Sequence, residues 1–323
     1  MKPSKHTGPI RAPRAVAAAV AAGLTAVVAV VALTSAPAAA GPSGPAPTAP
    51  APVKPGTLAA SVPPPCRPLT TTPPIDVPAV GVEAGPVLKA IAAHLHSVPA
   101  DRESGRYTVL VERFAAADTA IGDCTTTVTD TGTSTIWRDE ITDSGVTYGV
   151  AMHPATEPAP AATRDRFGPG ELPGAIPGRV PASPARLARL LDGRYPGPAG
   201  RVDGVGEIAR LHDTPPAARR ALLLVLAGVP RLRVHQGVTV DGRTGIAVTI
   251  DTDDDADHTI DSRHTLVIDA QSGEIYAYEQ VLLNAAIGHN LGVTVPYSQS
   301  LTVITGRGRT DRAGVLPATG QPV

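Results

Sequence analysis

The 323-residue sequence is poor in aromatic residues, in cysteine and in lysine, and it carries almost no net charge. Aromatic residues make up 3% of the chain, which leaves few large side chains to anchor a core. The 28 Lys and Arg residues nearly balance the 29 Asp and Glu residues, so no global field draws the chain toward nucleic acid. A nucleic-acid partner is therefore not expected.

Motifs that carry catalysis or bind cofactors are also absent. The sequence holds no G-x-S-x-G elbow, no S-x-x-K, no H-E-x-x-H and no phosphate-binding loop. His94 and His96 are two residues apart, and on a helix such residues point about 200° apart, so they are not expected to form a zinc pair. The sequence therefore predicts a protein without a catalytic motif, a cofactor or a resident metal. A hydrolase with a dispersed Ser/His site is kept as an alternative.

The N-terminus combines positive charge with a long apolar stretch. Residues 1–14 carry basic side chains and no acid, and residues 15–35 carry no charge at all. This is the arrangement of a secretion signal, and the small residues that end at Ala40 suit cleavage by a signal peptidase. About 20 apolar residues also span a bilayer. Residues 1–40 are therefore interpreted either as a cleaved signal peptide or as a signal anchor.

Both interpretations place the rest of the chain outside the cytoplasm, because the basic flank stays inside. The protein is either secreted after cleavage near Ala40, or anchored to the cell membrane by residues 15–35 with a short cytoplasmic N-terminus. In the second case the membrane is a partner of this segment. The later apolar run from Ala221 to Val229 is too short to span a bilayer and is predicted to be a core helix.

Two cysteines follow the export segment, Cys66 and Cys124. In an oxidising compartment such a pair is expected to form a disulfide, which would stabilise the fold by roughly 4 kcal/mol through loop closure. The alternative is that Cys66, which follows three prolines, stays free.

Composition divides the rest of the chain into three parts. Residues 41–82 are rich in Pro, Ala, Thr and Ser, which favours an extended linker over a folded unit. Residues 83–310 are predicted to form an extracytoplasmic domain, and residues 311–323 a disordered tail. The tail contains the sortase pattern Leu-Pro-Ala-Thr-Gly at 316–320, but without the hydrophobic helix and basic end that a sortase substrate carries. A wall-associated structural protein is therefore an alternative only.

Periodicity and turn residues predict strands in the first part of the domain. A helix is expected at 86–96. It precedes an antiparallel meander at 106–153 whose strands are rich in Thr, Val and aromatics, with turns at TDTGT and TDSG. A Pro/Gly-rich loop at 154–181 then leads to a helical middle.

Helix caps mark that middle region. Ser183 is expected to cap one helix and Thr214 a later one, with a short helix around Val205 and Ile208 between them. Strands return from residue 231 onward. The order of strands, helices and strands favours an α+β fold with a largely antiparallel sheet and helices on one face.

An acidic run invites a calcium interpretation. Carboxylates can surround a hard cation, and an irregular site would take its ligands from Asp251, Asp253, Asp255 and Asp257. An EF-hand loop, however, needs Gly and Glu at its sixth and twelfth positions, and these are Ala256 and Ser262 here. A solvated hairpin loop is therefore the favoured interpretation.

Most of the few aromatic residues fall on predicted strands. They are expected to anchor the packed face of the sheet, or alternatively to line an apolar ligand groove on the concave side of a curved sheet. These residues are Tyr107, Trp137, Tyr148, Tyr276 and Tyr278.

Several segments together resemble a known family. These are GPGELPGAIPGRVPASPARLARLL, DTPPAARRALLLVLAGVPRLRV, GRTGIAVTID and HTLVIDAQSGEIYAYE. The sequence resembles a family of uncharacterised actinobacterial membrane-anchored extracytoplasmic proteins. The hairpin and curved sheet are similar to the half-barrels of lipoprotein-carrier and sigma-regulator sensor domains, which cradle acyl chains or peptides. The resemblance implies a half-barrel-like sheet and binding of a lipid, a peptide or an envelope protein, and it assigns no residue to a site.

Overall fold

The computed structural model describes residues 72–121, 125–154, 156–252 and 261–317, all within the unit that runs from Ser61 to Val323. The expected N-terminal apolar helix, most of the linker and the candidate disulfide residues Cys66 and Cys124 lie outside these residues. Within them, no helix has the length and apolar character needed to cross a membrane.

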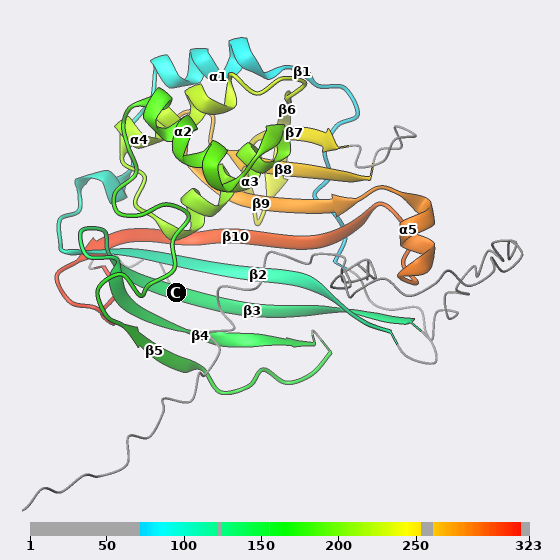
Figure 1. Ribbon diagram of the computed structural model, residues 1–323, viewed down its shortest axis with the longest axis horizontal. Helices are drawn as coiled ribbons and strands as arrows, with labels where there is room; N and C mark the ends of the chain where they lie inside the picture. The colour runs from blue at the N-terminus through cyan, green and yellow to red at the C-terminus, as the bar shows by residue number, and fades with distance from the viewer. Residues whose placement is uncertain (1–71, 122–124, 155, 253–260, 318–323) are drawn as a thin grey trace, which may run out of the picture. The chain divides into compact units, whose positions relative to one another are not determined.

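In the described residues, ten strands form one open antiparallel sheet in the order β1-β6-β7-β8-β9-β10-β2-β3-β4-β5 (Figure 1). The first half of the chain supplies β1 (Val82–Glu83), β2 (Tyr107–Ile121), β3 (Thr125–Asp139), β4 (Ser144–Pro154) and β5 (Thr163–Phe167). The second half supplies β6 (Arg233–Val240), β7 (Arg243–Thr252), β8 (Ser262–Ile268), β9 (Ile275–Leu282) and β10 (Tyr297–Thr310). Antiparallel pairing of β10 with β2 joins the two halves. The expected α+β class with a curved, antiparallel sheet is confirmed.

One predicted turn is wrong. The segment TDTGT belongs to β3, which pairs with β2 without interruption from Thr108↔Arg138 to Ile121↔Thr125. The β propensity of the Thr-rich segment prevails over the Asp and Gly that suggested a turn. Gly132 fits there because a Cβ at this position would lie 2.5 Å from the ring of Phe114, which covers the glycine.

Five α-helices and one 3-10 turn accompany the sheet in the described residues. They are α1 (Ala84–Ala93), η1 (Pro99–Arg102), α2 (Pro184–Arg194), α3 (Gly197–Leu211), α4 (Pro216–Leu226) and α5 (Ala285–Asn290). The predicted cap at Ser183 is confirmed, since its side chain accepts a hydrogen bond from the amide of Arg186. The predicted cap at Thr214 is wrong. Pro215 precedes α4, and the Thr214 hydroxyl instead accepts a hydrogen bond from Arg307.

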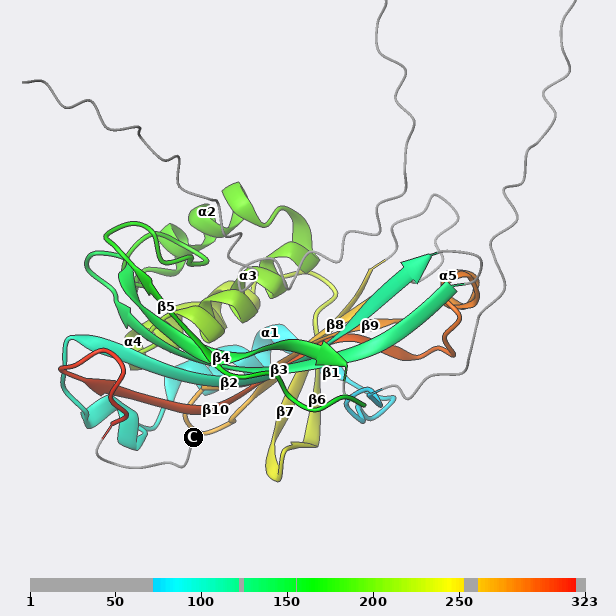
Figure 2. The ribbon, with the colours of Figure 1, turned by 90° about the horizontal axis from the view of Figure 1, so that it is seen from below.

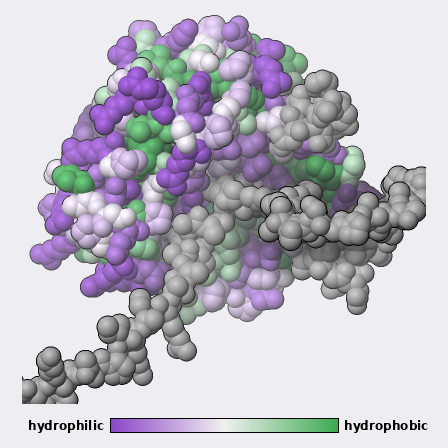
Figure 3. All heavy atoms as spheres, viewed as in Figure 1, coloured by the Kyte–Doolittle hydropathy of each residue, from purple (hydrophilic) through white to green (hydrophobic). Residues whose placement is uncertain are grey.

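Helix α3 packs directly on one face of the sheet, here called the helix-covered face. Val205 and Ile208 are fully buried, and a Cβ on Gly206 would lie 3.1 Å from the ring of Tyr278 on β9. A side chain at 206 would therefore push α3 away from the sheet. Figure 2 shows α2 and α3 on this side. Figure 3 views the same side, where hydrophilic residues interleave with hydrophobic ones.

The opposite face, here called the open face, is partly covered by the two ends of the described chain. Composition places residues 72–82 in the linker, but Ile75 and Val77 pack against an apolar cluster of the open face that includes Ala277. The sequence predicts a disordered tail from residue 311, but Ala313 packs against Trp137, whose indole N–H donates to the carbonyl of Val315 at 2.7 Å. Both segments therefore belong to the packed part of the protein.

Candidate functional site

An apolar groove of about 570 Å³ lies on the open face beside the N-terminal covering segment, residues 72–82. Residues of β2, β3, β4, β6 and β10 form its walls, and the N-terminal covering segment closes one side. The residues that matter for its apolar character are Pro74, Ile75, Phe114, Ala115, Val150, Val240, Leu301 and Val303.

The hairpin of β6 and β7 forms one wall of the groove. Asp241 and Gly242 both have positive φ, 53° and 74°, which is the geometry of the tight two-residue turn that favours Asp-Gly. Asp241 at the tip forms an ion pair with Arg113 of β2 at 2.5 Å. Arg113 faces Val303 in the register of β2 and β10, so the ion pair ties the hairpin tip to β2 across β10. Figure 2 shows the hairpin projecting on the side away from α2 and α3.

A buried carboxyl group holds the N-terminal covering segment in place. The amide of Ile75 donates to both oxygens of Glu279, at 3.1 and 3.0 Å, and the hydroxyl of Ser298 donates at 2.8 Å. Burial raises the pKa of Glu279 to about 7, although the bonds from Ser298 and Ile75 act in the opposite direction. The groove wall therefore rests on a group that titrates near neutral pH.

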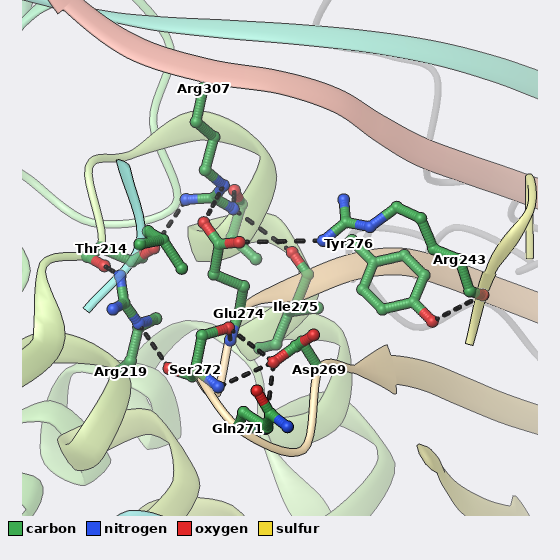
Figure 4. Close-up of polar contacts among 12 residues, drawn as sticks. Thr214, Arg219, Arg243, Asp269, Gln271, Ser272, Glu274, Ile275, Tyr276 and Arg307 are labelled. Carbon is green, nitrogen blue, oxygen red and sulfur yellow. Dashed lines mark hydrogen bonds and ion pairs between the residues drawn. The ribbon is translucent and has the colours of Figure 1, made fainter. Parts of the chain in front are cut away.

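A second, polar pocket of about 660 Å³ lies on the other side of the hairpin tip. It is formed by the chain around η1, the turn between β8 and β9, the start of β7 and the bulged part of β10. Figure 4 shows its centre, where Glu274 lies between the guanidinium groups of Arg307 and Arg243. The nearest contacts of the Glu274 oxygens are 3.9 Å to Arg307 Nε and 3.8 Å to Arg243 Nη2.

Arg307 is fixed in the wall of the polar pocket. Its Nη1 donates to the Thr214 hydroxyl at 2.6 Å, and its Nη2 donates to the carbonyl of Ala209 at 2.6 Å and more weakly to that of Ile275. Burial lowers the pKa of Arg307, while Glu274 and Asp213 raise it. Arg307 therefore joins β10 to α3 and leaves only its Nε directed at Glu274.

The turn between β8 and β9 forms the floor of the polar pocket. Arg219 of α4 donates to the carbonyl of Ser272 at 2.8 Å and binds both oxygens of Asp101, at 2.8 and 2.7 Å. Asp269 accepts bonds from the amides of Gln271 and Ser272 and from the Ser272 hydroxyl. Although burial acts the other way, these bonds hold the pKa of Asp269 below its usual value. These bonds therefore hold the turn in one conformation, and the turn also lines the pocket.

Arg243 is the more exposed of the two arginines that face Glu274. Its guanidinium stacks on the ring of Tyr276, 4.1 Å from the centroid, and the Tyr276 hydroxyl donates to the Arg243 carbonyl at 3.1 Å. The side chain is 43% exposed. Within the described residues its guanidinium N–H groups donate no hydrogen bond, because Glu274 is too distant for one.

The candidate calcium ligands are not brought together in the described part of the chain. Asp251 forms a two-bond ion pair with Arg263, at 2.7 and 3.0 Å, within the pairing of β7 and β8. Asp253, Asp255 and Asp257 lie outside the described residues. Among the residues that are described, no three His, Cys, Asp or Glu side chains are placed to hold a metal.

Two buried histidine rings each lie against a carboxylate. His212 is fully buried between the Glu140 carboxylate, 3.0 Å from Nδ1, and the amide of Ile176, 3.5 Å from Nε2. His264 Nδ1 lies 2.6 Å from Asp203, which also accepts a bond from the Tyr278 hydroxyl. No serine hydroxyl in this part of the chain is hydrogen-bonded to either ring.

None of the aromatic residues named from the sequence lines the apolar groove. Four of them pack on the sheet, but the expectation is wrong for Tyr148, which is 48% exposed. Tyr278 packs under α3, Trp137 packs under the C-terminal segment, and Tyr276 lines the polar pocket. The groove is lined by Phe114 instead. The residues of both cavities come from distant stretches of the chain, and only the strand order reveals that they meet.

Comparison with known proteins adds no assignment. A scan against protein-family models finds no match, and a search of the curated proteins finds none either.

Proposed function

We propose that the domain is an exported, non-enzymatic binding module whose apolar groove takes a single acyl chain of a lipid. The observation that carries the proposal is the groove itself. Its volume of about 570 Å³ falls within the range of about 300–1,000 Å³ that is typical of small-molecule sites. The resemblance to half-barrel carrier domains, read from the sequence, favours the same class of ligand.

The surroundings of the groove support an external ligand. Beside the groove the protein covers its own apolar surface with Ile75 and Val77. Leu301 and Val303, in contrast, face the cavity. When a ligand removes apolar surface from water, the free energy of binding becomes more favourable by about 25 cal/mol per Å². A slender acyl chain matches a groove that runs between a hairpin and the sheet.

Export is the second part of the proposal. It rests on the basic residues 1–14 and the uncharged residues 15–35. Fractionation of the native host followed by N-terminal sequencing tests it. We expect the protein in the membrane or the medium, beginning either at Met1 or close to Gly41. Recovery of an intact chain from the soluble cytoplasm would contradict export.

Native mass spectrometry of protein purified from its own host tests ligand binding. We expect a population with added mass, and organic extraction should release a molecule with an acyl chain. A homogeneous mass equal to that of the chain, with no lipid in the extract, would contradict the proposal.

A filled-groove variant tests the location of the ligand. Ala115 lines the groove, so Ala115→Phe places a ring where the chain is expected to lie. Ala185→Phe, at an exposed position of α2, is the matched control. We expect Ala115→Phe to lose the added mass and Ala185→Phe to keep it, with both variants folded by circular dichroism. If both variants keep the added mass equally, the ligand does not lie in the groove.

A further inference from the structure

We propose that the N-terminal covering segment is a latch on the apolar groove, closed while the carboxyl group of Glu279 is protonated and opened when this group ionises. The segment supplies one side of the groove, where Pro73, Pro74 and Ile75 are among the lining residues. An open latch therefore gives a bound acyl chain a way out. Ligand release through the latch rests on the proposed function, but opening of the latch can be measured without a ligand.

The segment is held at its C-terminal end and only lightly attached before it. Val82 pairs with Val234 in the short ladder of β1 and β6, which fixes the chain at that point. Gly81, just before it, passes closely over the ring of His235, where a Cβ would lie 2.6 Å from the ring carbon Cε1. Residues 78–80 are exposed. A segment with so few buried contacts can open without unfolding of the sheet.

Glu279 is the polar attachment point of the latch. Its side chain is fully buried, and in the described residues its hydrogen-bond donors are the Ile75 amide and the Ser298 hydroxyl. Opening removes the Ile75 amide and lets water reach the carboxyl group. Water stabilises a carboxylate far better than a buried site does, so ionisation favours the open state. The hydrogen bonds act the other way, but burial prevails and the pKa of Glu279 in the closed state is about 7.

No neighbouring charge compensates an ionised Glu279. Burial, and not an adjacent acid, raises its pKa, and no basic side chain in the described part of the chain forms an ion pair with it. Asp76, in the segment itself, is exposed. The other charged groups on the surrounding strands are paired with each other, Arg263 with Asp251 and Arg113 with Asp241. A carboxylate under the closed segment is therefore an isolated buried charge, which is costly.

His235 is the second titratable group under the segment. It is buried, with Nε2 3.0 Å from the hydroxyl of Thr249, and burial lowers its pKa. Protonation of His235 at low pH therefore favours opening, whereas ionisation of Glu279 favours opening at high pH. The two groups are separated by Thr249 and Thr265, which are neighbours in the register of β7 and β8. A variant without the Glu279 carboxyl group should retain only the opposite pH dependence of His235.

Hydrogen exchange of the unmodified protein without ligand tests the latch. With a closed-state pKa of about 7, the equilibrium constant for closing should fall about tenfold between about pH 6 and about pH 8. The protection factor of the Ile75 amide, which removes the intrinsic pH dependence of exchange, should fall by the same factor. The amides of β9 should exchange more slowly than that of Ile75 at both pH values. An unchanged protection factor, or equal exchange of Ile75 and β9, overturns the latch.

Glu279→Gln tests the role of the carboxyl group. The amide has the shape of the protonated acid, can accept the bond from Ile75 and does not ionise, so the segment should stay closed. Protection of Ile75 in this variant should not fall as the pH rises. Glu83→Gln, which changes an exposed glutamate on β1, is the matched control and should keep the tenfold fall. The same fall in all three proteins overturns the role of Glu279. Circular dichroism confirms that the variants are folded.

Release of a fluorescent polyene fatty alcohol in a stopped-flow experiment connects the latch to the ligand, because the alcohol does not titrate in this range. Its dissociation rate constant should rise about tenfold from about pH 6 to about pH 8 in the unmodified protein and in Glu83→Gln, but not in Glu279→Gln. Dissociation at the same rate at both pH values overturns release through the latch and leaves the groove as the binding site. If the alcohol does not bind although protection of Ile75 depends on pH, the proposed function fails and the latch stands.

Discussion

The backbone amide of Ile75 donates to both carboxylate oxygens of Glu279, across 204 positions of the sequence. This contact fastens the N-terminal covering segment to the open face of the sheet and so builds one wall of the apolar groove. The carboxyl group is fully buried, and burial raises its pKa from 4.5 to about 7. The attachment of the covering segment is therefore coupled to pH.

Replacement of Glu279 should remove part of the pH dependence of stability. The folded protein holds this proton at pH values where the unfolded chain has lost it. The contribution is fully present below about pH 4.5 and is lost as the pH rises through about 7. Urea unfolding measures the free energy of unfolding at about pH 5 and about pH 8. We expect it to fall between these two pH values by about 2–3 kcal/mol more in the unmodified protein than in Glu279→Gln.

The control for this prediction is Glu83→Gln, which removes an exposed glutamate at β1 and should leave the pH dependence unchanged. An identical pH dependence in the Glu279→Gln variant and the unmodified protein would show that Glu279 does not titrate in this range.

The single tryptophan reports whether the C-terminal segment is docked. Trp137 is buried, and its indole N–H donates to the carbonyl of Val315. A chain that ends at Thr310 should expose the indole to water, shift the fluorescence emission to longer wavelength and lose about 1–3 kcal/mol of stability. A chain that ends at Pro317 keeps the contact and should emit as the full chain does. Equal emission from the two shortened chains would mean that the tail does not cover Trp137.

Two neighbouring arginines should differ greatly in their contribution to stability. Arg138 is 1% exposed and its guanidinium contacts Asp143, Glu140 and the carbonyl of Pro173. Arg106 is 60% exposed and pairs with Asp139. Removing one partner of a buried ion pair leaves uncompensated charge, so Arg138→Ala should cost about 3–5 kcal/mol. Arg106→Ala should cost less than about 1 kcal/mol.

The melting temperatures of these two variants check the prediction. If Arg138→Ala fails to accumulate as soluble protein while Arg106→Ala is obtained in normal yield, that outcome also supports the larger loss of stability predicted for Arg138→Ala. Similar melting temperatures for both variants would contradict the role assigned to the buried cluster.

The sequence predicted the class of fold because its signals are local. The cap at Ser183 and the alternating strands around 231–304 each depend on nearby residues. The predictions that failed concern segments whose structure is set by pairing with distant strands. TDTGT is a strand because fourteen residues of β3 pair with β2, and the charged β5 at 163–167 is a strand because it pairs with β4.

The candidate site could not be predicted from the sequence for the same reason. Pro74, Ala115, Val240 and Leu301 are far apart in the chain and meet only because β10 pairs with β2 and the β6–β7 hairpin bends over the open face. Arg243 carried no signal at all, since a single arginine after an Asp-Gly turn is ordinary. Composition also concealed the covering segment, because Ile75 and Val77 stand among prolines.

Titration of the purified protein with a fluorescent polyene fatty acid tests the acyl-chain groove most directly. Saturable one-to-one binding is predicted for the unmodified protein and for Ala185→Phe, and affinity lower by about tenfold or more for Ala115→Phe, whose added ring fills the groove. Equal affinity in all three proteins, or no saturable binding in any of them, would contradict the account.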